Sequence, residues 1–319
     1  MKNKVLSYLD YFFVLRPSLF FPVWTVSLAG YWAQQRFDRN EIWHDFNIII
    51  FQSDISYIIV IALFTLVMGA SFLINQIEDA DSDRLNNKLF LIANGDISVR
   101  NAYIETAVVL AIPAVFFLLS RIDLLFVSAA AFIVTGFFYS CKPYKMKDRP
   151  FGGLVINVLG YYVVFALAWM IKGEVNAKML LHSTPYTLGL SAVYFLTLIP
   201  DVEGDRNSGK ITLAVRYGDK PVLWLGLLTN SLAILAAILS GDLVVLLPTA
   251  AVMPFYMLAA IIRSLNHALW TTRYATLFLS LMICYRFPLY LLLIIFLYFF
   301  ARWYYKNRFN VNYPSFSAR

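Results

Sequence analysis

Two groups of carboxylates stand out in a chain that is otherwise mostly apolar. The first group comprises Asn75, Asp79 and Asp83, which occupy positions i, i+4 and i+8. The second comprises Asp201 and Asp205, at positions i and i+4. In a helix this spacing projects the side chains of each group from one face. Carboxylates near a bilayer are costly and rarely occur there without a function.

Two opposed carboxylate faces predict a metal site. They would repel each other strongly unless divalent cations lay between them. Magnesium bound by a few carboxylates usually shares its coordination shell with substrate phosphates. We therefore expect a Mg²⁺ site and a diphosphate substrate, with the four aspartates also acting in catalysis. The expected metal ligands are Asn75, Asp79, Asp83, Asp201 and Asp205.

Two simpler interpretations of the acidic groups are weaker. The run from Asp79 to Asp83 superficially resembles a calcium loop, but an EF-hand needs glycine where Arg84 stands and glutamate where Phe90 stands. A solvated acidic rim that merely ends a helix would explain one group. It explains less well two groups on the same predicted face, each with an i+4 pair.

Basic residues follow both acidic groups. Arg84 follows the first, and Arg206 and Lys210 follow the second. Lys and Arg side chains bind diphosphate oxygens through charge-assisted hydrogen bonds, so these three are candidate diphosphate ligands. The alternative is that they only reflect the excess of positive charge in cytoplasmic loops.

The most basic loop, residues 142–150, lies between the acidic groups in the sequence. Lys145 and Lys147 in this loop are further candidate diphosphate ligands. Tyr139, just before it, could stabilise a developing allylic cation with its aromatic face, or be an ordinary interfacial tyrosine. Arg16, at the start of the first apolar run, could reach the phosphates or simply snorkel to the interface.

Composition predicts an all-α polytopic membrane protein. The 319 residues are 60% hydrophobic and 14% charged, with a mean hydropathy of +0.67, whereas soluble domains carry about 25% charged residues. Apolar stretches of about 18 residues recur along the chain, as in helical membrane proteins. We expect nine transmembrane helices, near residues 14–35, 55–77, 102–120, 122–141, 152–171, 183–200, 221–240, 243–265 and 280–304.

The distribution of charge predicts the orientation in the membrane. A cytoplasmic N-terminus would place both acidic loops and the basic loop in the cytoplasm, in agreement with the positive-inside rule. We expect an inner or plasma membrane protein whose active site faces the cytoplasm. The net charge of +7 is spread over short loops, which does not suggest nucleic-acid binding.

The C-terminal tail raises a conflict, because nine spans leave this basic segment outside. A broken hairpin over residues 270–305, around Arg286 and Pro288, would return it to the cytoplasm. We favour nine spans over this alternative.

The acidic groups lie about 126 residues apart and follow the second and sixth predicted spans. This spacing predicts one domain over residues 1–319, built from two quasi-repeated halves at about 1–141 and 150–319. The halves would surround a central cavity, with one acidic face from each at its mouth.

Three ordered motifs together resemble the UbiA superfamily of intramembrane prenyltransferases. The first is Asn-x-x-x-Asp-x-x-x-Asp, and the second is Asp-x-x-x-Asp followed by Gly-Lys-x-Thr-Leu. Between them lies a Tyr-Ser-x-x-Pro-x-basic-x-Lys pattern. These motifs stand at Asn75, Asp79 and Asp83; at Asp201, Asp205, Gly209, Lys210, Thr212 and Leu213; and at Tyr139, Ser140, Pro143, Lys145 and Lys147.

The resemblance implies nine transmembrane helices around a central cavity that holds a Mg²⁺-bound polyprenyl diphosphate, with its tail in a laterally open tunnel. Loss of diphosphate would give an allylic cation-like species that an acceptor captures. Ala93-x-Gly95-x-x-Ser98 is similar to homogentisate-type enzymes, and Arg16-Pro-Ser-Leu-Phe-Phe-Pro22 to the chlorophyll-synthase branch. The family's usual Arg-Pro before the Gly95 turn is replaced by Phe90-Leu-Ile.

The predicted function is Mg²⁺-dependent transfer of a polyprenyl chain to an acceptor, for which we favour an aromatic ring in quinone-type biosynthesis. Alternative acceptors are a non-aromatic lipid or a tetrapyrrole carboxylate. The expected partners are a polyprenyl diphosphate, a lipophilic or aromatic acceptor, and membrane lipid. A cation transporter is a more distant alternative, because it would place charged residues at the bilayer midplane.

Overall fold

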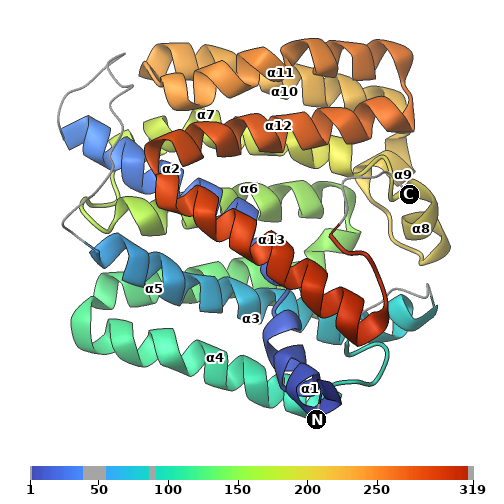
Figure 1. Ribbon diagram of the computed structural model, residues 1–319. Coiled ribbons are helices and arrows are strands. Elements are labelled where there is room, and N and C mark those ends of the chain that lie inside the picture. The colour runs from blue at the N-terminus through green and yellow to red at the C-terminus, as the bar shows by residue number, and fades with distance from the viewer. Residues whose placement is uncertain (1, 39–54, 86–90, 315–319) are drawn as a thin grey trace.

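The computed structural model describes residues 2–38, 55–85 and 91–314. In these residues the chain is helical and contains no strand (Figure 1). The long helices are α1 (Lys2–Phe13), α2 (Phe20–Asp38), α3 (Ser56–Leu85), α4 (Val99–Ser120), α5 (Ile122–Phe132), α6 (Pro150–Trp169), α7 (Ala177–Thr197), α10 (Asp219–Ser240), α11 (Leu243–Ile262), α12 (Leu265–Arg286) and α13 (Pro288–Phe309). The short ones are η1 (Pro17–Leu19), η2 (Ile133–Phe138), η3 (Met146–Asp148), α8 (Val202–Asn207) and α9 (Leu213–Tyr217).

The long helices pack side by side as a bundle, with neighbours in the chain also neighbours in space. In Figure 1, α3, α4 and α5 lie on one side, α10, α11 and α12 on the other, and α2, α6 and α7 between them. The closest pairings are α7 with α10, α10 with α11, α11 with α12, and α2 with α6. The all-helical membrane fold predicted from composition is confirmed. The division into two quasi-repeated halves stays a prediction.

Local sequence explains where the helices turn and how closely they approach. Gly241 ends α10 in a left-handed conformation with φ of 63°, which glycine adopts without steric cost. Asp242 then caps α11 by accepting a hydrogen bond from the Val244 N–H at 3.0 Å. Gly30 lets α2 approach α6, because a Cβ at this position would lie 2.5 Å from the Phe165 carbonyl oxygen.

Seven helical runs among the described residues are long and apolar enough to cross a membrane. The first of them, Leu6–Phe37, joins α1, η1 and α2. The exact count of nine spans stays a prediction.

The last predicted span is wrong in one respect, because residues 280–304 do not form a continuous helix. The chain breaks at Phe287, between α12 and α13. Pro288 begins α13, where its missing N–H costs no helical hydrogen bond. Arg286 is buried, and its guanidinium carbon lies 3.2 Å from the centre of the Trp32 ring. The structure thus has the broken hairpin around Arg286 and Pro288 in place of a single last span.

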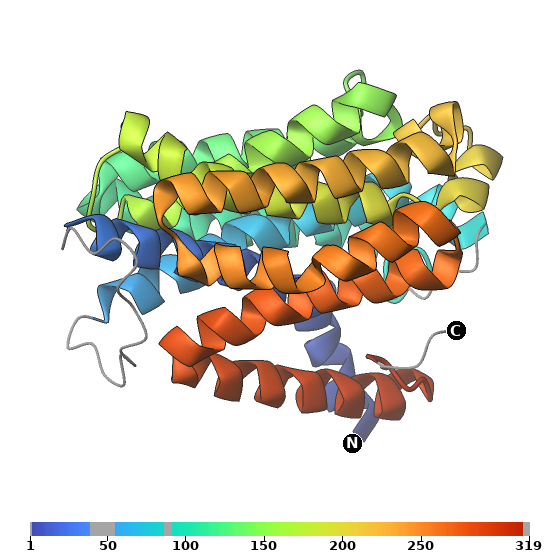
Figure 2. The same cartoon turned by 90° about the horizontal axis from the view of Figure 1, so that it is seen from above.

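The hairpin turns the chain back toward the end of the bundle that carries α8 and α9 (Figure 2). Near the end of α13, Arg308 lies 3.0 Å from Asp10 in α1 and 2.8 Å from Asp96 in the loop after α3. Tyr304 donates a further hydrogen bond to Asp10 at 2.6 Å. The end of α13 therefore lies beside the loop that follows the first acidic group.

Candidate active site

The first acidic group lies on the last turns of α3, packed against the end of η2. Asp79 and Asp83 are buried, with exposed fractions of 8% and 7%. The Asn75 amide donates a hydrogen bond to the Ser140 hydroxyl at 3.1 Å. The i, i+4, i+8 spacing therefore does what the sequence predicts: it directs the three side chains inward from one helix face.

The basic loop folds back over this face. Lys147 Nζ lies 2.5 Å from Asp79 Oδ2, and both side chains are largely buried. Lys145 Nζ lies 3.9 Å from the other oxygen of Asp79 and 3.3 Å from Asp148 Oδ2. Both predicted lysines therefore meet the first acidic group.

The second acidic group reaches the same region through the segment after α8. The Ile211 N–H donates to the Asp148 carbonyl at 3.1 Å, which joins this segment to the basic loop. The Lys210 N–H donates to the Asp205 carbonyl at 2.9 Å. Asp201 is exposed at the start of α8, and Asp205 is half-buried.

The pKa of Asp205 responds to its own acidic group and to the basic loop. Burial raises this pKa, and the nearby Asp201 and Asp148 carboxylates raise it further, against the effect of Lys210. Burial also lowers the pKa of Lys147, although its contact with Asp79 opposes that shift. Lys210 acts on Lys147 as well, so cations of both loops lie near one another.

Four other candidates occupy different positions. Arg16 and Tyr139 both line a cavity inside the helix bundle. Lys147 Nζ lies 5.9 Å from the centre of the Tyr139 ring. Arg206 is exposed in the last turn of α8. Arg84 is exposed, and its Nε donates to the Ala93 carbonyl at 2.9 Å, toward the loop after α3.

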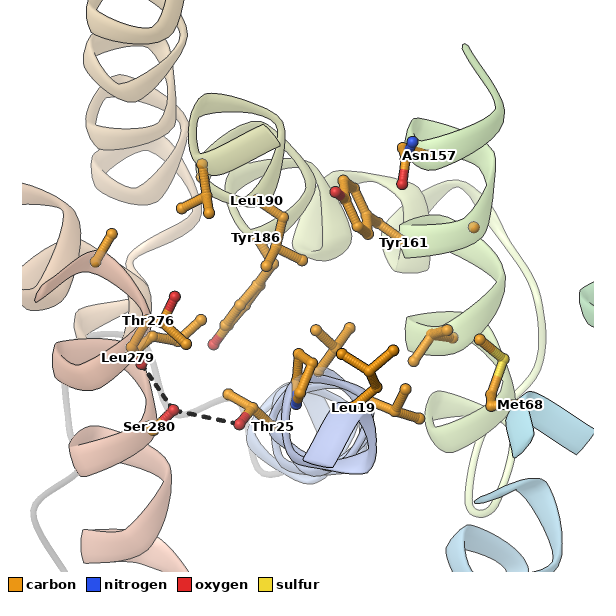
Figure 3. A pocket seen from close by; sticks show the side chains of 18 of the residues that line it. Leu19, Thr25, Met68, Asn157, Tyr161, Tyr186, Leu190, Thr276, Leu279 and Ser280 are labelled. Carbon is orange, nitrogen blue, oxygen red and sulfur yellow. Dashed lines mark hydrogen bonds between the residues drawn. The ribbon is translucent and has the colours of Figure 1, made fainter. Parts of the chain in front are cut away.

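A cavity of about 400 Å³ lies inside the bundle next to this mouth, and Figure 3 shows part of its lining. Arg16, Asn75 and Tyr139 belong to its lining, so the first acidic group and the basic loop adjoin it. Deeper lining residues come from α2, α6, α7, α10, α11 and α12 and are mostly apolar. A pocket of this size and character suits a small hydrophobic ligand with few polar contacts.

The chemistry of the acidic groups fits Mg²⁺. Their side chains supply only oxygen ligands, which this cation prefers. Across the described residues, no three Asp, Glu, His or Cys side chains are grouped closely enough to hold an ion by themselves.

A model of the UbiA prenyltransferase family matches residues 50–274, which is more than half of the chain. The chain belongs to this family. The family resemblance predicted from the three motifs is therefore confirmed.

Two solved structures of the UbiA fold align over most of the chain. One, a UbiA homologue from Archaeoglobus fulgidus bound to DMAPP and Mg²⁺, has a TM-score of 0.65 at 20% identity and covers 88% of this chain and 98% of its own. The other, from work on digeranylgeranylglyceryl phosphate synthase, has a TM-score of 0.64 at 19% identity, with 89% and 97% covered. At this identity the similarity shows the fold alone.

Curated relatives match over a shorter region. A 2-acyl-4-prenylphloroglucinol 6-prenyltransferase from Humulus lupulus is 29% identical, over 48% of this chain and 40% of its own. A probable homogentisate phytyltransferase 2 from Oryza sativa is 28% identical, with 54% and 49% covered. The bacteriochlorophyll synthase 34 kDa chain of Chloroflexus aurantiacus is also 28% identical, with 48% and 49% covered. The chain spans about half the length of these relatives.

Sequence reasoning missed Asp148, which contacts Lys145 and joins the basic loop to the second acidic segment. The sequence did contain a sign of its role, because Asp148 is the one acidic residue in the most basic loop of the chain. The cavity-lining residues Asn157, Tyr161 and Asn230 were also missed. Polar residues are scattered through many apolar helices, and hydropathy does not show which of them face a cavity.

Proposed function

We propose that this protein transfers a polyprenyl chain from a polyprenyl diphosphate to an acceptor in a Mg²⁺-dependent reaction. The observation that carries this proposal is the meeting of both acidic groups and the basic loop beside one apolar cavity. A diphosphate fits the charged mouth, and an isoprenoid tail fits the apolar interior. A prenyl diphosphate combines both features, a strongly anionic head and a hydrocarbon chain.

Each group at the mouth has a distinct role in this proposal. Asn75, Asp79, Asp83, Asp201 and Asp205 would hold magnesium, which supplies positive charge to stabilise the departing diphosphate. Lys145, Lys147 and Lys210 would bind the remaining diphosphate oxygens, with Arg206, Arg84 and Arg16 further out. Lys147 already lies against Asp79. When the diphosphate binds, the ammonium group of Lys147 would therefore share its N–H donors between Asp79 and the diphosphate.

The Tyr139 ring lines the cavity beside this mouth and would face the allylic carbon as positive charge develops there. The apolar walls would exclude water from the cation-like species. The acceptor would then capture the prenyl carbon in place of water. Removal of the acceptor proton would complete the reaction on an aromatic ring.

The proposed acceptor class is an aromatic ring in quinone-type biosynthesis. The names of two similar proteins refer to phloroglucinol-type and homogentisate substrates, which are aromatic. A third is a bacteriochlorophyll synthase chain, so a tetrapyrrole acceptor is the second candidate.

A cation transporter is less well supported. Such a protein would need ionisable side chains along its transport path at the bilayer midplane. Among the described residues that line the cavity, Arg16 at the mouth is the one charged side chain.

We also propose that the mouth faces the cytoplasm, in an inner or plasma membrane. The basic loop and the segment carrying Arg206 and Lys210 lie at this end of the bundle, and the end of α13 brings Arg308 there as well. This clustering of Lys and Arg is what the positive-inside rule requires of cytoplasmic loops.

The test compares Asp79→Ala and Asp205→Ala with Asp219→Ala in membranes. Asp219 is an exposed carboxylate at the start of α10 and serves as the matched control. Prenyl transfer with Mg²⁺ should be abolished in the first two variants and retained in the third. Undiminished turnover in either site variant would contradict the proposal.

Purified protein should also release pyrophosphate with some combination of prenyl donor and acceptor. Chelation of Mg²⁺ should stop the release, and added Mg²⁺ should restore it. If no combination releases pyrophosphate, and liposomes instead show cation flux that depends on Asp79, the transporter is the better interpretation.

A further inference from the structure

The α6 wall of the cavity carries two polar side chains that the diphosphate chemistry does not use. Asn157 and Tyr161 lie at positions i and i+4 on α6, and both line the cavity. Figure 3 shows Tyr161 reaching from α6 toward the α7 side of the pocket, with its hydroxyl leading. An isoprenoid tail is a hydrocarbon and offers these groups no partner.

Two phenols of this region, Tyr161 and Tyr256, have no hydrogen-bond partner among the described residues. The Tyr256 hydroxyl, on α11, is buried and has no partner among the described residues, and the Tyr256 side chain is 1% exposed. Tyr256 lies close enough to Tyr161 to interact with it electrostatically. Within the described parts of the chain, no hydrogen bond to the Tyr161 hydroxyl occurs either. Hydroxyls inside a protein nearly always have a hydrogen-bond partner. Because Tyr161 lines the cavity, a ligand atom can be the partner of its hydroxyl.

Asn157 supplies the complementary group. Its Nδ2 donates to the Gly153 carbonyl at 2.7 Å, so its amide oxygen is the atom left to accept. One face of α6 therefore offers a phenol donor and an amide acceptor one turn apart. A ligand hydroxyl can both accept from the first and donate to the second.

The charge of the wall restricts which ligand fits. A carboxylate or phosphate buried here would need a cation or several strong donors. Among the described lining residues the one cation is Arg16, which lies at the mouth with Asn75 and Tyr139. The deeper wall offers neutral donors and acceptors, which suit an uncharged hydroxyl or carbonyl.

We infer that Asn157 and Tyr161 form the acceptor subsite and that the acceptor is an uncharged hydroxyarene of the hydroquinone type. A ring hydroxyl would accept a hydrogen bond from Tyr161 and donate one to Asn157. The ring would then lie in the same cavity as Tyr139, where the prenyl carbon is expected. This inference rests on the proposed function for the identity of the bound molecule as an acceptor.

Equilibrium binding to purified protein in lipid nanodiscs tests the subsite without turnover. The probes are methylhydroquinone and 2,5-dihydroxybenzoate, a matched neutral and anionic pair, with Mg²⁺ and inorganic pyrophosphate present and oxygen excluded. Methylhydroquinone should bind more tightly than 2,5-dihydroxybenzoate. Tyr161→Phe should weaken methylhydroquinone binding about three- to tenfold, the effect of one neutral hydrogen bond.

Tyr162→Phe is the matched control, because the Tyr162 hydroxyl interacts with Thr184 at 3.4 Å and Tyr162 does not line the cavity. Its binding of methylhydroquinone should be unchanged. Asn157→Leu should weaken binding in the same direction as Tyr161→Phe. Equal affinities in Tyr161→Phe and Tyr162→Phe, or tighter binding of 2,5-dihydroxybenzoate, would overturn the inference.

A transfer assay separates this inference from the proposed function. With an active protein, Tyr161→Phe should raise KM for a hydroquinone acceptor and leave KM for the prenyl diphosphate unchanged. Tyr161-dependent binding without any prenyl transfer would refute the proposed function and keep the subsite. Prenyl transfer with an acceptor KM insensitive to Tyr161→Phe would refute the subsite and keep the function.

Discussion

Asp242 should be one of the most important side chains for stability, although it lies outside the proposed chemistry. Its side chain is fully buried between α10 and α11, and the Arg36 side chain beside it is 5% exposed. Asp242 accepts hydrogen bonds from the Tyr186 hydroxyl and the Val244 N–H, both at 3.0 Å, and Arg36 Nη2 lies 3.4 Å away. The network thus joins α2, α7 and the α10–α11 turn.

The expected loss in Asp242→Ala can be worked out from these contacts. Removing one partner of a buried ion pair costs about 3–5 kcal/mol, and removing a helix N-cap costs about 1 kcal/mol. Arg36 would still donate to the Gly241 and Ser240 carbonyls, at 2.5 and 3.3 Å, which offsets part of the loss. We therefore expect a decrease of about 4 kcal/mol in the free energy of unfolding.

Asp242→Asn keeps an oxygen for the Val244 N–H and should cost less, about 1–2 kcal/mol. Asp123→Ala is the matched control, because Asp123 also forms an ion pair at a turn between two helices. Its pair with Arg121 is open to solvent, with side-chain exposures of 42% and 40%. Exposed pairs contribute at most about 1 kcal/mol.

The measurement is reversible unfolding in lipid–detergent micelles, followed by circular dichroism for the wild type and the three variants. The expected order of destabilisation is Asp242→Ala, then Asp242→Asn, then Asp123→Ala. Equal losses for Asp242→Ala and Asp123→Ala would refute the reasoning, because burial would then make no difference to the two pairs.

Two further substitutions test the packing that positions the site. Gly30→Ala would place a Cβ 2.5 Å from the Phe165 carbonyl oxygen and should lower the unfolding free energy by about 1–3 kcal/mol. Gly226→Ala is the control, because its Cβ would lie 3.5 Å from the nearest atom and should not lower the unfolding free energy. A similar midpoint of thermal unfolding for the two variants would contradict the α2–α6 contact. Arg308→Ala would leave Asp10, with a side chain only 3% exposed, without its charged partner, at a cost of about 2–3 kcal/mol. Amide hydrogen exchange in α1 should then be faster in Arg308→Ala than in the control variant Arg302→Ala. The one hydrogen bond described for the Arg302 guanidinium is an exposed one to the Tyr298 hydroxyl, at 3.2 Å. Equal exchange in the two variants would argue against the Asp10–Arg308 contact.

Local periodicity accounts for what the sequence alone determined about this protein. The long apolar runs specify membrane helices, because a bilayer demands about 20 apolar residues and satisfied backbone hydrogen bonds. The four-residue spacing of Asp79 and Asp83 places both carboxylates on one helix face, and both are buried there. These features depend on the 3.6-residue repeat of a helix and need no knowledge of its neighbours.

Tertiary structure decided which faces meet, because that depends on crossing angles and close approaches between distant helices. Hydropathy did not show that Lys147 would contact Asp79, or that Asp148 would join the two loops. Hydropathy also favoured a single last span. In the structure a second helix begins at Pro288, and this helix brings Arg308 to Asp10. The sequence did not distinguish Tyr161 from the many other aromatic residues of the chain, whereas the packing of the helices places it at the cavity. A one-dimensional pattern records the direction of a side chain around its own helix, but only the packed bundle determines what lies opposite.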